Sequence, residues 1–132
     1  MDENQISAVI VDAALEVHRT LGGPGLLESV YRDALIWEVR QRNVLVESEK
    51  KVPVLYKGHV VGNPLQLDLL VGGLVIVECK ATIQYNTIFE SQLLTYLRLT
   101  GLKLGLVINF GERKVKYGIH RVVNGLQEAS PT

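Results

Sequence analysis

Two short apolar strands that meet at a Gly-Gly turn at 72–73 constrain this chain more than any other feature. The stretch 67–80 consists mostly of Leu, Val and Ile, which is typical of buried strands. It also carries Asp68, Glu78 and Lys80. A carboxylate in such a strand costs several kcal/mol of desolvation unless another group compensates it. Three ionisable groups in this stretch therefore indicate a metal and a polar substrate.

The period of a strand decides which of these side chains lie together. Side chains alternate between the two faces of a sheet, so Glu78 and Lys80 face one side and Cys79 faces the other. Asp68, on the preceding strand, must reach the face of Glu78 if the two carboxylates are to share a metal. The length of the loop between the strands determines whether it does.

Two loop lengths are compatible with the glycine pair. A two-residue turn pairs Val71 with Leu74 and puts Asp68 and Glu78 on opposite faces. A three-residue loop with a bulge pairs Val71 with Val75 and brings the two acids opposite each other. Paired glycines accept the positive φ that this bulge needs. We predict the bulged loop, and the functional interpretation depends on it.

The residue types suit a hard cation. Mg²⁺ or Mn²⁺ prefers carboxylate and carbonyl oxygens, so Asp68, Glu78 and the backbone carbonyl of Cys79 are candidate ligands. The metal would polarise a phosphodiester and acidify a bound water, and Lys80 would orient that water or stabilise phosphate charge. The alternative is that Glu78 and Lys80 are strand-end residues, solvated or paired at the rim.

Composition sets the bounds for this interpretation. The 132 residues predict one domain, 1–132, and fourteen basic against fourteen acidic residues leave no net charge. That balance argues against nonspecific nucleic-acid binding, but it is compatible with a local cleft whose charge is balanced elsewhere on the surface. One cysteine excludes an internal disulfide, and no apolar run reaches the ~18 residues of a membrane span. We expect a cytoplasmic protein with no membrane partner.

Periodicity predicts an α/β or α+β domain with the order ααβββαββ. The apolar side of the second helix is expected to be Val30, Ala34, Leu35, and Trp37 or Val39. The glycines at 58 and 72–73 are expected in hairpin turns. The expected elements are helices at about 5–21 and 26–42, strands at 44–56, 59–71 and 74–80, a helix at 87–100, and strands at 104–110 and 114–120.

Gly25, Glu28 and Tyr31 have the spacing G-x-x-E-x-x-Y, by which the chain resembles the GxxExxY protein family. By that resemblance it is similar to the PD-(D/E)XK nuclease-like superfamily. The similarity continues through Asp68, the triplet 78–80, and the segments 92–96 and 104–111. It implies a restriction-endonuclease-like core, in which helices flank a central mixed β-sheet.

The resemblance implies a role for each matching residue. Asp68 and Glu78 correspond to the metal-binding acids and Lys80 to the catalytic lysine. Glu28 corresponds to an extra acid that some members add to the metal site, although a carboxylate at a helix start is also favoured by the helix dipole. The sequence departs from the pattern at Leu67, which precedes Asp68 where the family has proline.

Gln92 and Tyr96 match the Q-x-x-x-Y helix motif of exonuclease-type members, in which these residues support the lysine and the substrate phosphate. A spacing of four puts both on one helix face. Tyr96 can equally be an ordinary core aromatic. Gln92 is expected to be buried, where its amide needs partners. Tyr31 is expected in the core with its hydroxyl bonded to a neighbour.

The leading hypothesis is a metal-dependent nuclease that hydrolyses DNA or RNA phosphodiesters with Mg²⁺ or Mn²⁺. The alternative is a non-catalytic nucleic-acid- or protein-binding module that retains the fold, which the neutral charge favours. A homodimer is possible. A basic cluster either lines a phosphate path or is a solvated hairpin. Its members are Arg113, Lys114, Lys116 and Arg121.

Overall fold

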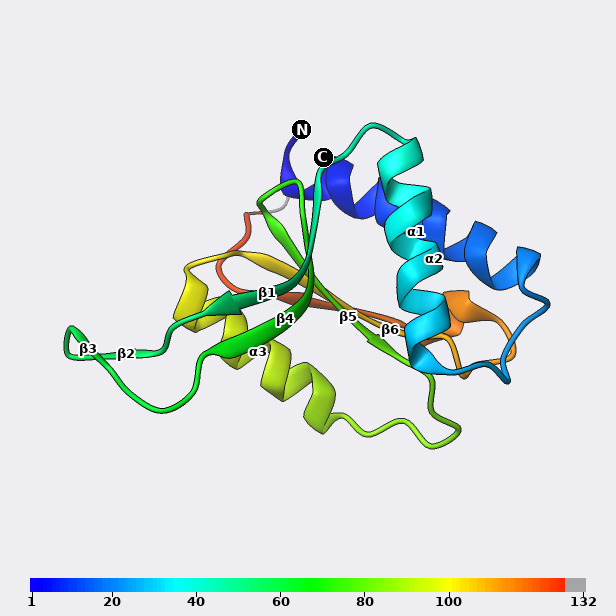
Figure 1. The fold of residues 1–132 in the computed structure, drawn as a ribbon. Helices are drawn as coiled ribbons and strands as arrows, with labels where there is room; N and C mark the ends of the chain where they lie inside the picture. Colours follow the sequence, from blue (N-terminus) through cyan, green and yellow to red (C-terminus); the bar gives the residue numbers. More distant parts are fainter. Residues whose placement is uncertain (128–132) are drawn as a thin grey trace.

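A mixed five-stranded sheet forms the centre of the molecule, with α1 and α2 on one face and α3 on the other (Figure 1). This computed structural model describes residues 1–127. The strand order is β1-β4-β5-β6-β7, and only β5 and β6 are parallel. The elements are α1 (Glu3–Thr20), α2 (Glu28–Gln41), β1 (Val46–Val52), β2 (Leu55–Tyr56), β3 (His59–Val60), β4 (Leu65–Val71), β5 (Val75–Lys80), α3 (Ile88–Thr100), β6 (Leu104–Asn109), the short 3-10 helix η1 (Val115–Gly118) and β7 (Ile119–Val123). The architecture confirms the predicted α/β class.

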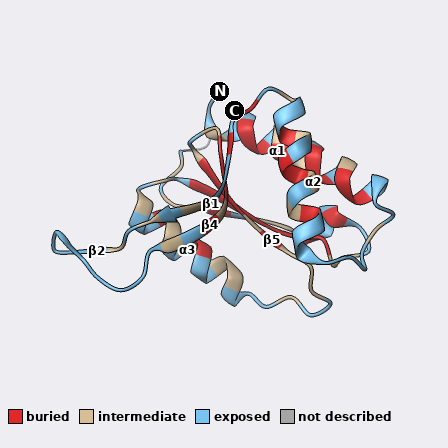
Figure 2. Cartoon of the chain, viewed as in Figure 1, coloured by how far each residue is buried: buried red, intermediate tan, exposed pale blue. Residues whose placement is uncertain are grey.

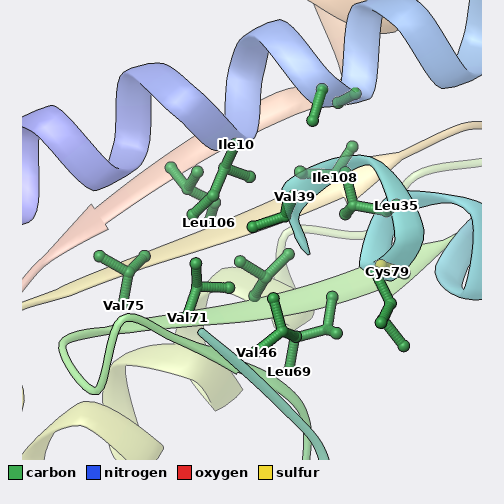
Figure 3. Close-up of a cluster of buried hydrophobic side chains, with 14 of the residues drawn as sticks. Ile10, Leu35, Val39, Val46, Leu69, Val71, Val75, Cys79, Leu106 and Ile108 are labelled. Atoms are coloured by element: carbon green, nitrogen blue, oxygen red, sulfur yellow. The ribbon is translucent and has the colours of Figure 1, made fainter. Parts of the chain in front are cut away.

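The three central strands β4, β5 and β6 are mostly buried on both faces, as their apolar sequences predict, whereas the edge strands β1 and β7 are largely exposed (Figure 2). In β5, Val75, Val77 and Cys79 pack in the cluster under α1 and α2, and Ile76 packs in the cluster under α3. Figure 3 shows Cys79 among the side chains of the first cluster. No helix among residues 1–127 is long and apolar enough to span a bilayer.

The loop between β4 and β5 has the predicted three-residue form. Val71 pairs with Val75, so the loop consists of residues 72–74. Gly72 and Gly73 have φ angles of 59° and 71°, which residues other than glycine rarely adopt. The amide of Gly72 donates to the Leu45 carbonyl at 2.7 Å, which ties the loop to the start of β1. The register on which the candidate site depends is therefore confirmed.

The strand predicted at 114–120 is wrong in its first half. The chain forms η1 there and enters β7 only at Ile119, continuing to Val123. The alternation of polar and apolar residues suggested a strand, but Val115 is buried by one 3-10 turn against α1 instead. Gly118 permits this path, because a Cβ on it would lie 2.3 Å from the Asn109 carbonyl oxygen.

Two other predicted strands are divided. The segment 44–56 separates into β1 and β2 around Pro53, and 59–71 separates into β3 and β4 before Pro64–Leu65. Proline cannot donate to a sheet ladder, which explains both interruptions. The Lys57-Gly58 turn is confirmed, since Tyr56 pairs with His59. Hairpin β2–β3 stands away from the main sheet (Figure 1).

The buried side of α2 differs in part from the prediction. Leu35 and Val39 are buried, together with Tyr31 and Ile36, which the expected apolar stripe did not include. Trp37 is 60% exposed and Val30 is 40% exposed. The open choice between Trp37 and Val39 is settled in favour of Val39.

Asn109 joins the ends of β5 and β6. It is fully buried; its Oδ1 accepts from the amides of Thr82 and Gly111, and its Nδ2 donates to the Thr82 carbonyl, each at 3.0 Å. Gly111 packs so closely on Thr82 that a Cβ there would lie 2.3 Å from the Thr82 carbonyl oxygen. This joint fixes the loop that leads from Lys80 to α3.

We expect Asn109→Ala to lower the free energy of unfolding by about 3 kcal/mol, because it leaves three backbone groups without partners. Urea denaturation measures this. Asn124→Ala is the matched control, since Asn124 donates one side-chain hydrogen bond, to the Leu102 carbonyl. The control should lose about 1 kcal/mol. Equal losses would contradict the assigned role of the Asn109 joint.

Candidate active site

Asp68 lies where β4 and β5 separate. The backbone pairing of the two strands ends at Leu69 opposite Val77. Beyond that point the amide of Cys79 donates at 2.9 Å to Oδ2 of Asp68. The carboxylate thus takes the place of a strand carbonyl and sits in the gap between the strands.

The regular alternation of β4 also breaks at this residue. Leu69 packs in the cluster under α1 and α2, whereas Leu67, two residues earlier, packs in the cluster under α3. On the other side of β4, the pairing with β1 passes over Asp68 and Glu49, and Glu49 has a φ of 52°. β4 and its neighbour β1 are therefore both locally irregular around Asp68.

Glu78 faces Asp68 from β5. Its Oε1 is buried and has no hydrogen-bond partner within residues 1–127. Burial raises the pKa of Glu78 from 4.5 to about 8, and the charge of Asp68 and a hydrogen bond to it act in the same direction. A hydrogen bond from the Asp68 backbone, and then the charge of Lys80, partly offset this by lowering the pKa. Near neutral pH Glu78 therefore holds a proton unless a cation replaces it.

Lys80 ends β5 on the same face as Glu78. It pairs with Asn109 of β6, and its Nζ lies 4.5 Å from the centre of the Phe89 ring. Phe89 comes from the first turn of α3, so this cation–π contact links the lysine to the helix that covers the site.

Glu28 approaches from the other face of the sheet as the first residue of α2. Its pKa is raised, with burial as the largest cause; Lys80 and Arg32 act against the rise and Asp68 adds to it. Glu28 is thus close enough to feel the charges of both Lys80 and Asp68. The structure brings the extra acid to the edge of the candidate site.

Gln92 and Tyr96 lie on one face of α3, as their spacing predicts. Nε2 of Gln92 donates to the Tyr96 hydroxyl at 2.9 Å. Burial raises the pKa of Tyr96, and the charge of Glu78 raises it further, which places the hydroxyl near the acids. The prediction that Gln92 is buried is wrong: it is exposed, because it lies at the open rim of the site.

Cys79 and Tyr31 have the structural positions expected for them. Cys79 is fully buried away from the acids, and burial raises the pKa of its thiol. Tyr31 is fully buried, donates to the Gly23 carbonyl at 2.7 Å and stacks on Phe110. Of Cys79, only the backbone carbonyl remains a candidate ligand.

The donor set can be tested against a divalent cation. Within residues 1–127 no three His, Cys, Asp or Glu side chains converge as a complete metal cluster. Mg²⁺, however, is commonly held by one or two carboxylates, with waters and substrate oxygens completing its shell. The unpartnered Oε1 of Glu78 opposite Asp68 fits that incomplete kind of site.

An aromatic cluster beside the site was missed by the sequence analysis. Tyr85 stacks on His120 with ring centres 4.0 Å apart and packs edge-on against Phe89, the residue that contacts Lys80. Its hydroxyl donates to Glu90 at 3.0 Å, and burial raises its pKa. These residues come from three separate segments, so no spacing in the sequence signals the cluster.

Comparison with protein families identifies the superfamily to which the chain belongs. Residues 4–122 match the PD-(D/E)XK nuclease superfamily, and the protein belongs to it. The matched range extends from the first turn of α1 into β7 and includes every residue of the candidate site. Comparison with curated proteins and with solved structures gives no match.

The raised pKa of Glu78 predicts a pH-dependent stability for the metal-free protein. Folded Glu78 retains its proton up to about pH 8, whereas the unfolded residue loses it near 4.5. The folded state therefore binds more protons in this window, and its stability falls as pH rises through it, by up to ~1.4 kcal/mol per pH unit. Urea unfolding in chelator across the window measures this.

Glu78→Gln is the matched variant, since it keeps the shape and removes the titration. We expect it to be more stable than the wild type near pH 8, and the difference to shrink toward pH 5. Parallel stability curves for the two proteins would contradict a buried, protonated carboxyl at this position.

Proposed function

We propose that the protein is a metal-dependent nuclease that hydrolyses phosphodiester bonds of DNA or RNA. Asp68, Glu78 and the Cys79 carbonyl would hold Mg²⁺ or Mn²⁺, with Glu28 as an additional acid at the rim. When bound, the cation would supply Lewis-acid polarisation of the phosphodiester and a more acidic water. The G-x-x-E-x-x-Y spacing of Gly25, Glu28 and Tyr31 supports membership of the GxxExxY family within the superfamily.

The other side chains have roles set by their chemistry. Lys80 carries a positive charge beside the acids, where it would stabilise the phosphate or orient the attacking water. Phe89 would limit the directions in which the Lys80 ammonium points. The Gln92–Tyr96 pair, at the rim on α3, would contact the substrate phosphate through its free amide hydrogen.

One observation carries this proposal. Asp68 and Glu78 meet in a gap between two strands, and Glu78 holds a buried oxygen that no group within residues 1–127 satisfies. Native proteins rarely leave a buried carboxyl oxygen unpaired. Beside a second carboxylate and a lysine, such an oxygen fits a cation ligand better than a packing residue.

Cleavage of labelled single- and double-stranded DNA and RNA tests the function directly. We expect cutting that depends on Mg²⁺ or Mn²⁺ and falls at least about 100-fold in Glu78→Gln, Asp68→Asn and Lys80→Ala. Asp68→Asn retains an oxygen that can accept from the Cys79 amide. Lys57→Ala, at the tip of hairpin β2–β3, is the control and should cut normally. Full activity in any site variant would refute the mechanism.

Thermal or urea unfolding with added metal tests the cation site without any substrate. A cation at 100 times its dissociation constant should stabilise the fold by ~2.7 kcal/mol at pH 8. The increment should disappear in Glu78→Gln and shrink at lower pH, where the proton competes. The absence of both a metal-dependent increment and cleavage would favour a non-catalytic module with the same fold.

A further inference from the structure

A strongly basic turn extends from the end of β6 across the surface beside α1. We call Arg113, Lys114 and Lys116, together with Tyr117, the basic turn. All four side chains are exposed. Within residues 1–127 none of its three cations forms an ion pair with a carboxylate. In a chain with no net charge, this is a local concentration of unneutralised positive charge.

Two hollows in the surface border the basic turn. One, of about 390 Å³, is lined by Arg113, Lys114 and Lys116 and by Arg19 of α1, with His18 beside them. The second, of about 450 Å³, is lined by Arg113, Lys114, Tyr117 and Glu112. Because Arg113 and Lys114 border both, the two hollows lie next to each other. Figure 1 shows the orange turn beside the C-terminal part of α1.

Along the chain, the basic turn follows a residue that pairs with the candidate active site. The segment that leads into the basic turn starts at Asn109, which pairs with Lys80 across β5 and β6. The next residue, Phe110, stacks on Tyr31 at 4.9 Å, and Tyr31 lies one turn after Glu28 on α2. The basic turn therefore follows directly on the end of β6 that pairs with Lys80 at the end of β5.

The side chains of the basic turn indicate the ligand class. Tyr117 is 66% exposed, and Lys116 Nζ lies over its ring at 5.0 Å, so a cation and an aromatic surface stand side by side. Proteins bind single-stranded nucleic acid by this combination, in which cations follow the phosphates and aromatic rings stack on bases. A duplex keeps its bases stacked on one another and cannot use the ring.

We propose that the basic turn binds the backbone of a single-stranded nucleic acid. This inference rests on the proposed nuclease function, in which another part of the same nucleic acid is the substrate of the candidate active site. It identifies the substrate class as a single strand or an unpaired end. The neutral net charge of the chain is compatible with this role because the charges are segregated on the surface.

Fluorescence anisotropy with a labelled single-stranded oligonucleotide tests the proposal. It is run in chelator, so that no cleavage occurs. The triple variant Arg113→Ala, Lys114→Ala, Lys116→Ala should bind at least about 10-fold more weakly at low salt. The slope of log K against log salt should shrink by about 0.7 for each lost phosphate contact. Equal binding by the variant and the wild type, or no binding by the wild type, would overturn the proposal.

A matched triple variant controls for net charge. Lys51→Ala, Lys57→Ala, Lys103→Ala removes the same number of exposed cations from other surfaces, and Lys57 lies in hairpin β2–β3, at the opposite end of the view in Figure 1. It should retain most of the affinity and the salt slope. If both triples weaken binding equally, the attraction is general and the basic turn is not the site.

Tyr117→Ala tests the choice of a single strand over a duplex. Its matched control is Tyr56→Ala, since Tyr56 is 61% exposed and also carries a lysine, Lys57, over its ring at 5.5 Å. Loss of one stacked base should weaken single-strand binding by about 5-fold or more without changing the salt slope. Tighter binding of a duplex that Tyr117→Ala leaves unchanged would overturn the single-strand assignment.

The two proposals fail in different ways. Binding through the basic turn is measured without metal, so a wild type that binds but never cuts would refute the nuclease and leave the surface standing as a binding site. Metal-dependent cutting by a basic-turn triple variant with unchanged oligonucleotide affinity would establish the nuclease and refute the proposed binding surface.

Discussion

The geometry of the candidate site depends on the hydrogen bond from the Cys79 amide to Asp68. It stands where β4 and β5 stop pairing, and it satisfies an amide that would otherwise lose its ladder partner. The strands can separate there without leaving a buried donor unsatisfied. The separation in turn makes room for Glu78 and Lys80 to face Asp68. One carboxylate therefore has a structural function and a candidate chemical function at once.

The Oε1 atom of Glu78 has no comparable structural function. Within residues 1–127 this atom has no hydrogen-bond partner, and burial together with the neighbouring Asp68 raises the pKa of Glu78 to about 8. Any cation bound between the two acids must displace that proton, so metal affinity and pH are coupled. In the metal-free protein, the proton neutralises the charge of the Glu78 carboxylate. The charge of Lys80 partly lowers the raised pKa of Glu78. Lys80 lies on the same face of β5 as Glu78, and within residues 1–127 it forms no ion pair with Asp68 or Glu78.

The arrangement of the two acids was predictable from the sequence because it depends on the number of residues in the strands and in the loop between them. The period of two in a strand and the length of the loop at 72–74 together determine the register, and the confirmed pairing of Val71 with Val75 follows. The break in alternation between Leu67 and Leu69 was not predictable, since Leu can pack on either face. Neither was the position of Gln92 at the rim, because an amphipathic helix has no sequence mark that separates its buried face from its edge.

Errors outside the site have a similar origin. Lys114 to Gly118 alternates like a strand, but the close approach of Gly118 to the Asn109 carbonyl favours a 3-10 turn, and this turn packs on α1, which is far away in the chain. The contact of Phe89 with Lys80 and the stack of Tyr85 on His120 likewise join distant segments. Local patterns predict elements and their faces; they do not predict which faces meet.

The physical contrast between Asp68 and Glu78 bears on whether the fold is catalytic. A module that only retained the fold would still need the Asp68 oxygen to hold the Cys79 amide, so the presence of Asp68 does not separate the two hypotheses. Glu78 does separate them, because a fold without metal gains nothing from a buried oxygen that lacks a partner. An apolar or amide side chain there would avoid the desolvation of a carboxylate. The energetic disadvantage of Glu78 in the metal-free protein is thus the strongest physical argument that the protein uses this position for chemistry.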